Sequence, residues 1–118
     1  ARGVDARDLA QVAGCFTADA TYSGTLGTGT ITDALATLHV AMGRYVATVH
    51  RLGNQVVRFD GDRAQSETDC LAEHVLPDGA HLLVAVRYRD DLIRQPQGWR
   101  ITRRVVTALW RQEAPSHA

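Results

Sequence analysis

Residues 45–110 read YVATVHRLGNQVVRFDGDRAQSETDCLAEHVLPDGAHLLVAVRYRDDLIRQPQGWRITRRVVTALW, which is four long runs of apolar and polar residues separated by turn signals. The separators are Asp60-Gly61-Asp62, Pro77-Asp78-Gly79 and Gln95-Pro96-Gln97-Gly98. Asp-Gly and Pro-Asp-Gly between β-rich runs are typical of hairpins. We therefore expect strands over about 46–59, 63–76, 81–94 and 99–111. Strands of this length twist and curl, so the meander should be a curved sheet.

The first third of the chain is expected to be mainly helical. Residues 1–16 carry an apolar stripe at helical spacing, with a break before Asp8, which can cap the second segment. A short strand should start at 19–22, and the glycine- and threonine-rich segment 23–30 should be a mobile loop. A further helix is expected from Thr30 or Thr32 to about Arg44. Helices followed by a meander predict an α+β domain whose curled sheet closes over a pocket.

Length and composition indicate one domain, expected over residues 1–112, with a disordered polar tail at 113–118. The formal net charge is zero, which argues against nucleic-acid partners and a polybasic membrane anchor. All 13 basic residues are arginine, so Schiff-base chemistry and lysine-held cofactors are excluded. Cys15 and Cys70 are expected to be reduced core thiols. We find neither a membrane-length apolar run nor a signal peptide, and expect a cytoplasmic protein.

His50 is the first candidate for chemistry. Alternation places it on one strand face with Thr48 and Leu52, where an imidazole is either a buried structural hydrogen-bonding group or a general base. A histidine base needs an orienting carboxylate, and Asp5 is the candidate, although it could equally cap a helix or lie in solvent. Gly53 interrupts this strand and is expected to form a bulge.

Arginine and aromatic residues could complete a pocket. Arg103 and Arg104 are adjacent in the last strand, so one of them should face inward, toward either a ligand oxyanion or an acid at the sheet edge. Four aromatic residues are candidates for ligand contact or for the core: Tyr22, Tyr45, Tyr88 and Trp110.

The remaining histidines and glycines carry no recognisable site. We expect His39 to pack beside the stripe of its helix, and His74 and His81 to be exposed beside the Pro-Asp-Gly turn. The five histidines lack the spacing of metal ligands, so no metal is expected. The glycines that precede the 30–44 helix match no phosphate-binding fingerprint.

An ordered series of motifs resembles the SnoaL-like proteins of the NTF2-like superfamily. The series comprises VDARDL (4–9), FTADATY (16–22), TVHRLGN (48–54), FDGDRA (59–64), RYRD (87–90) and GWRITRRVV (98–106). The resemblance implies a cone of curved mixed sheet wrapped by N-terminal helices around a deep apolar pocket. Members include polyketide cyclases, dehydratases, a hexachlorocyclohexane dehydrochlorinase and the small subunits of ring-hydroxylating dioxygenases.

The resemblance also implies roles for particular residues. Several lyases of the family share an Asp–His dyad, and Asp5 and His50 match its two positions. Arg104 matches an arginine that reaches the pocket in two of these lyases. Tyr22 matches an aromatic pocket residue and Tyr88 roughly a tyrosine of the bile-acid dehydratase, whereas the tyrosine that precedes the dyad aspartate in some dehydratases would fall before Ala1.

Two functions remain open on the sequence. The first is an enzyme without metal or cofactor that uses the dyad to take a proton from an apolar cyclic or polyketide-like substrate, giving dehydration, another elimination, isomerisation or cyclisation. The second is a non-catalytic module, either a small-ligand carrier or a protein like the dioxygenase β-subunit. In both cases we expect a homodimer or higher homo-oligomer, because a long exposed sheet face needs cover.

Overall fold

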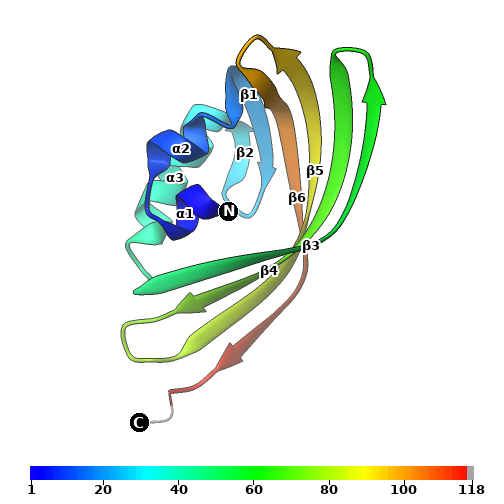
Figure 1. Cartoon of the computed structure of the whole chain (residues 1–118). Helices are drawn as coiled ribbons and strands as arrows, with labels where there is room; N and C mark the ends of the chain where they lie inside the picture. Colours follow the sequence, from blue (N-terminus) through cyan, green and yellow to red (C-terminus); the bar gives the residue numbers. More distant parts are fainter. Residues whose placement is uncertain (117–118) are drawn as a thin grey trace.

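Four long strands joined by tight turns make up most of the molecule, in agreement with the turn signals. In the computed structural model, which describes residues 1–116, the elements are α1 (Arg2–Asp5), α2 (Leu9–Ala13), β1 (Phe16–Gly24), β2 (Gly27–Thr30), α3 (Ile31–Met42), β3 (Ala47–Asp60), β4 (Arg63–Val75), β5 (His81–Gln95) and β6 (Gly98–Ala114). The helices lie against one face of a curved sheet (Figure 1). The predicted α+β class is therefore confirmed.

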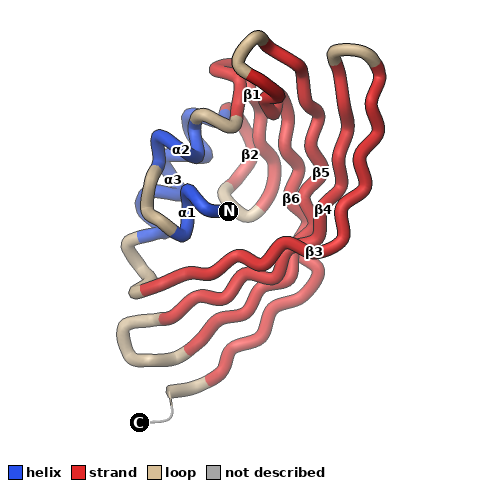
Figure 2. Tube along the Cα trace, viewed as in Figure 1, coloured by secondary structure: helices blue, strands red, loops and turns tan. Residues whose placement is uncertain are grey.

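The described strands form one mixed sheet in the order β2-β1-β6-β5-β4-β3. β1 runs parallel to β6, and the other neighbouring pairs are antiparallel. The long strands bend near their middle, so that their lower halves pass beneath the helices (Figure 2). Because β2 and β3 are the two edges, the sheet stays open and presents a concave face to the helices.

Side-chain caps fix where the helices begin. The backbone N–H of Gln11 donates to Asp8 Oδ1 at 3.0 Å, so Asp8 caps α2 as predicted. The backbone N–H of Asp33 donates to Thr30 Oγ1 at 3.2 Å and starts α3 in the same way. Arg7, between α1 and α2, has a φ of 60°, which breaks the helical path after the first short helix. The predicted break in the N-terminal helix is thus confirmed.

The hairpin between β3 and β4 sets the register of the site. Gly61, with a φ of 60°, and Asp62 form a two-residue turn, and Phe59 lies opposite Ala64. The register shifts between Leu52 and Gln55, which confirms the bulge expected at Gly53. Beyond the bulge, His50 lies opposite Ala72 and Thr48 opposite His74.

Two expectations for the N-terminal third were wrong. The first strand begins at Phe16 rather than at 19, and residues 27–30 of the expected loop form β2. β2 pairs with the end of β1, with Ser23 opposite Thr28. A four-residue strand of alternating glycine and threonine has no apolar periodicity, and Gly27, at a φ of 102°, follows the two-residue turn that joins β1 to β2.

The chain also differs from expectation at its end and at one cysteine. The boundary expected at 112 falls inside β6, which continues to Ala114 because it stays paired there with His81 of β5. Residues 117–118 of the expected disordered tail lie outside the described residues. Cys70 is a buried free thiol as expected, but Cys15 is exposed because it follows the end of α2.

The core lies between α3 and the concave face of the sheet. Its buried members are small or medium-sized side chains: Ala20, Tyr22, Ile31, Ala34, Cys70, Val86 and Val106. Partly buried Phe16, Leu35 and Tyr88 pack against this cluster. The helices and the curved sheet are therefore in contact at one end, and a cavity lies between them towards the lower half of the sheet.

Candidate active site

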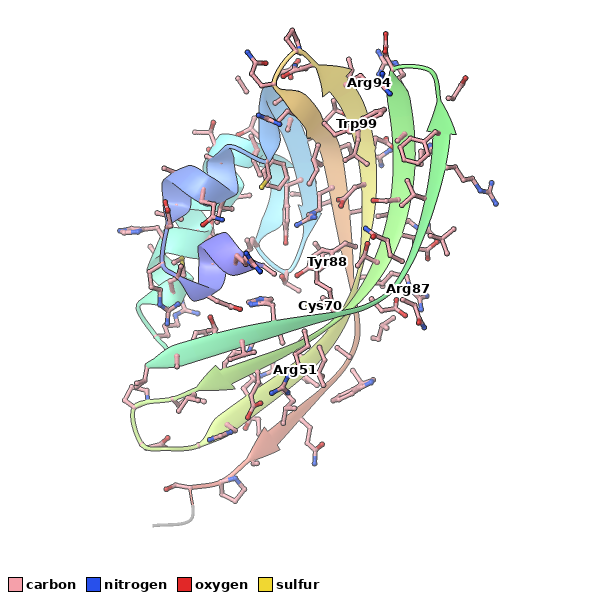
Figure 3. All side chains as sticks on the ribbon, viewed as in Figure 1. Arg51, Cys70, Arg87, Tyr88, Arg94 and Trp99 are labelled. Carbon is pink, nitrogen blue, oxygen red and sulfur yellow. The ribbon has the colours of Figure 1, made fainter. Side chains whose placement is uncertain are left out.

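A cavity of about 780 Å³ lies between the helices and the concave face of the sheet. Its walls are mainly apolar, with contributions from α1 to α3, from β1 and from β3 to β6. Tyr88 and Cys70 lie on the side of the sheet that faces the helices, and Arg87 lies on the opposite side (Figure 3). A cavity of this size and character suits a small organic ligand with a few polar groups.

Asp5 and His50, 45 residues apart in sequence, meet at the wall of this cavity. Asp5 Oδ1 lies 2.6 Å from His50 Nδ1, and Asp5 Oδ2 accepts the backbone N–H of His50 at 2.8 Å. Thr48 Oγ1 donates to Asp5 Oδ1 at 3.0 Å. The side chain of His50 is 12% exposed and that of Asp5 26% exposed. Asp5, the last residue of α1, is thus bound to two alternate residues of β3, Thr48 and His50.

These hydrogen bonds fix the protonation of the pair. Burial raises the pKa of Asp5, but the backbone and ring N–H groups of His50 and the Thr48 hydroxyl outweigh burial and hold it below its ordinary value. An ionised carboxylate can only accept, so Nδ1 of His50 must carry a proton in this contact. The Nε2 atom of the neutral ring is then unprotonated, and His50 lines the cavity. This is the tautomer that a general base requires.

Arg104 is the arginine of the pair that faces the cavity. Its Nε and Nη2 atoms donate to Asp90 Oδ1 and Oδ2, both at 2.8 Å, and the carboxylate of Asp90 is buried. The guanidinium carbon lies 4.3 Å from the centre of the Tyr88 ring. Arg103 is exposed and does not line the cavity, because neighbouring strand residues face opposite sides. Asp90 was not anticipated as the partner of this cation.

All four predicted aromatic residues line the cavity, in different settings. Tyr22 is 7% exposed and belongs to the core, with its hydroxyl 3.4 Å from Thr25 Oγ1. Burial raises the pKa of Tyr88 well above its ordinary range, and the neighbouring Cys70 thiol adds to the effect, so Tyr88 stays a neutral phenol. Trp110 is 51% exposed and lies at the rim.

His74 is a pocket residue that the sequence analysis missed. It was expected to be exposed, but it lines the cavity, with its ring centre 6.1 Å from that of His50 and 4.6 Å from that of Tyr45. Nδ1 of His74 lies 3.1 Å from the carbonyl oxygen of Leu82, which can only accept, so Nδ1 carries the proton. Burial lowers the pKa of His74, against a smaller rise from the Leu82 carbonyl. The site therefore holds two imidazoles, each with an unprotonated Nε2 when neutral.

Other histidines lie away from the cavity. His81 Nδ1 lies 2.7 Å from Glu73 Oε1, with the His81 side chain 43% exposed, and His39 is exposed on α3 rather than packed. Within residues 1–116 there is no group of three or more histidine, cysteine or carboxylate side chains arranged to hold a metal ion. None of the helices described has the length and apolar character of a membrane span.

The fold and the cavity define a class of protein: an open α+β cone with an apolar pocket lined by an imidazole that is paired with a carboxylate. Comparison with known proteins supplies the family. Residues 1–105 match the family model of the SnoaL-like domain, so the chain belongs to this family and the resemblance inferred from the sequence motifs is confirmed. Its fold is that of the NTF2-like proteins.

Curated relatives match part of the chain. The chain is 38% identical over 77 residues to the uncharacterized protein Rv2910c of Mycobacterium tuberculosis, a match that covers 64% of this chain and 52% of that protein. The chain therefore spans about half the length of the curated relatives it matches.

Solved structures show the same fold. The Kfla4162 protein from Kribbella flavida is 27% identical, with a TM-score of 0.83 over 95% of this chain and 84% of that chain. The hexachlorocyclohexane dehydrochlorinase LinA-type3 from Novosphingobium barchaimii is 21% identical, with a TM-score of 0.82 over 95% of this chain and 80% of that chain.

Proposed function

We propose that this protein is a cofactor-independent enzyme of the lyase, isomerase or cyclase type, in which His50 takes a proton from an apolar cyclic or polyketide-like substrate. The observation that carries the proposal is the 2.6 Å contact between Asp5 Oδ1 and His50 Nδ1 at the wall of an apolar cavity. When a carboxylate binds one nitrogen of a largely buried imidazole, the other nitrogen is available for acid–base chemistry.

In the proposed step, Nε2 of His50 accepts a proton from carbon or oxygen of the substrate. The ring becomes an imidazolium, and the Asp5 carboxylate stabilises that charge through Nδ1. Asp5 itself stays ionised, because its three donors favour the charged form. The electron pair released from the substrate moves to its carbonyl oxygen or expels a leaving group.

Arg104 and Tyr88 are the groups proposed to stabilise the negative charge that develops. A guanidinium group has five N–H donors, and the two that bind Asp90 leave three for a ligand oxygen. Tyr88 remains protonated and can donate its hydroxyl. Because Arg104 is held by a buried carboxylate and by the Tyr88 ring, it is positioned before the substrate arrives, as electrostatic stabilisation requires.

Family and fold support this proposal without deciding the reaction. The chain is a SnoaL-like protein, and its fold also houses a hexachlorocyclohexane dehydrochlorinase, by name an elimination enzyme. Elimination, isomerisation and aldol-type cyclisation all begin with the same proton abstraction. The pocket geometry supports that shared step, and the substrate selects the outcome.

The test is hydrogen–deuterium exchange, which needs the shared step alone. The protein is incubated in D₂O with the cyclic ketones 1-tetralone, 2-tetralone and anthrone, and loss of the proton next to the carbonyl is followed by NMR. We expect the protein to accelerate exchange of at least one ketone, and His50→Ala to lower that acceleration by about 10²–10⁴, the usual contribution of a positioned base. His39→Ala, which removes an exposed histidine of α3, is the matched control and should leave the acceleration unchanged.

Two results would count against the enzyme. Exchange by the wild type at the buffer rate would favour the alternative of a ligand carrier or assembly module. Full acceleration by a folded His50→Ala protein would remove His50 as the base.

A further inference from the structure

The mouth of the cavity carries an excess of positive charge that the net charge of the chain does not reveal. The chain has 13 basic and 13 acidic residues, yet the cavity lining includes no aspartate or glutamate and the following arginines: Arg2, Arg7, Arg44, Arg104 and Arg111. Arg104 is paired with Asp90, and Arg111 lies 3.2 Å from Glu113. Within the described residues, Arg2, Arg7 and Arg44 form no ion pair.

Arg7 is held at the mouth in an unfavourable backbone conformation. Its φ of 60° is in the left-handed region, and it is the one non-glycine residue among those described with a positive φ. Its Nη2 donates to the backbone carbonyl of Tyr45 at 2.9 Å, which ties the α1–α2 connection to the segment before β3. A strained residue that persists beside a pocket is a reason to look for a function of its side chain.

Arg7 acts on the same part of the pocket as the dyad. Tyr45, whose carbonyl binds Arg7, contacts the His74 ring in a tilted arrangement, and His74 lies beside His50. Burial is the main cause that lowers the pKa of His74, and the charge of Arg7 makes a small contribution in the same direction. Arg44 follows the end of α3, is exposed and lines the same opening.

We propose that the substrate is an apolar ring system bearing a carboxylate, and that Arg7 and Arg44 bind this carboxylate at the mouth while the rings reach His50. The inference rests on the proposed function for the identity of the inner site. The carboxylate of the inner site, Asp5, is already engaged by three donors, so it does not neutralise these arginines. Guanidinium groups suit this role because their planar donors match a carboxylate.

The experiment compares two ligands of nearly the same shape, of which one is an anion and the other is neutral. 2-Naphthoate and its neutral isostere 2-naphthamide are titrated into the protein by NMR at low ionic strength. We expect 2-naphthoate to bind at least about tenfold more tightly, equivalent to about 1.4 kcal/mol. Arg7→Gln and Arg44→Gln should each reduce this preference to about twofold, by weakening naphthoate and leaving naphthamide unchanged. Arg58→Gln is the matched control, because Arg58 is exposed on β3 and does not line the cavity.

A further variant separates this proposal from the catalytic one. His50→Ala should keep the preference for naphthoate, since it leaves both arginines in place. The preference should also fall at high salt, because the arginines are exposed. Equal affinity for the two ligands, binding of neither, or an unchanged preference in both arginine variants would overturn the carboxylate site. Retained exchange activity in the same preparations would show that the dyad proposal stands without it.

Discussion

Asp5→Asn is the substitution that tests the central contact most directly, because it changes charge and donor pattern with almost no change in shape. Three donors converge on this carboxylate: the His50 backbone N–H is a fixed donor, and the Thr48 hydroxyl and His50 Nδ1 donate because a carboxylate can only accept. An asparagine amide offers one accepting oxygen and one donating nitrogen. The three contacts of Asp5 therefore cannot all keep their present donor–acceptor direction.

The amide has two possible orientations. With its oxygen toward Thr48 and Nδ1, the NH₂ group opposes the backbone N–H of His50, donor against donor. With its NH₂ toward Nδ1, the backbone contact survives, but Nδ1 of His50 must become the acceptor. The proton of the neutral ring then moves to Nε2, which can no longer act as a base.

The size of the effect follows from these contacts. An unsatisfied or mispaired donor in a partly buried site costs about 1–3 kcal/mol, so the free energy of unfolding should fall by this amount. Loss of the base tautomer should reduce ketone exchange by about 10²–10⁴, similar to removal of His50. Stability and activity should therefore both respond, with activity far more sensitive.

The tautomer can be measured without a substrate. In protein labelled with ¹⁵N-histidine, the nitrogen shifts of the neutral ring distinguish the protonated from the unprotonated nitrogen. We expect Nδ1–H in the wild type and Nε2–H in Asp5→Asn. Asp8→Asn is the matched control, because Asp8 caps α2 three residues away and asparagine caps a helix equally well. A wild-type ring protonated at Nε2, or an Asp5→Asn protein with unchanged shifts and exchange rate, would refute the reasoning.

Two further predictions concern groups around the dyad. Asp90→Asn should lower the free energy of unfolding, measured in urea titrations, by about 3 kcal/mol. This is the low end of the range for a broken buried ion pair, because the Arg104 side chain is 23% exposed. A loss no larger than that caused by Asp91→Asn would contradict this prediction. Burial lowers the pKa of His74 from 6.5, so the native state binds its proton less readily than the unfolded state. The contribution of His74 to the free energy of unfolding should be constant above pH 6.5 and should fall below it by at most about 1.4 kcal/mol per pH unit. His74→Gln should remove this contribution to the loss of stability in acid. Identical pH profiles of stability for the two proteins would count against the prediction.

The strands were predictable because their turns are local. Asp-Gly and Pro-Asp-Gly need no tertiary context to be recognised, and Asp8 marks the start of α2 by its own side chain. β2 was not predictable, since its glycine–threonine sequence carries no apolar pattern and only pairing with β1 makes it a strand. The parallel pairing of β1 with β6 joins residues about 80 positions apart, which no periodicity encodes.

The residues of the site were harder to predict from local sequence than the strands were. Asp5 and His50 were connected by family resemblance, because strand alternation places His50 but says nothing about an acid 45 residues earlier. His74 had a usable signal that was overlooked. Counting back from the two-residue turn at Gly61 and allowing one bulge residue places it opposite Thr48, on the face shared with His50. Asp90 gave no such signal, because an aspartate in a strand of mixed polarity is ordinarily exposed.

The bulge at Gly53 is what turns His50 into the pocket. Between the hairpin and the bulge, Gln55 and Phe59 lie opposite Thr68 and Ala64, two buried residues of β4, so odd-numbered residues of β3 face the concave side. An unbroken strand would continue this alternation and present Val49 and Arg51 to the cavity, with His50 on the outer face. The single extra residue reverses the alternation, because Leu52 then lies opposite buried Cys70 and His50 opposite buried Ala72. The contact between Asp5 and His50 therefore depends on an irregularity in the strand as much as on the two residues themselves.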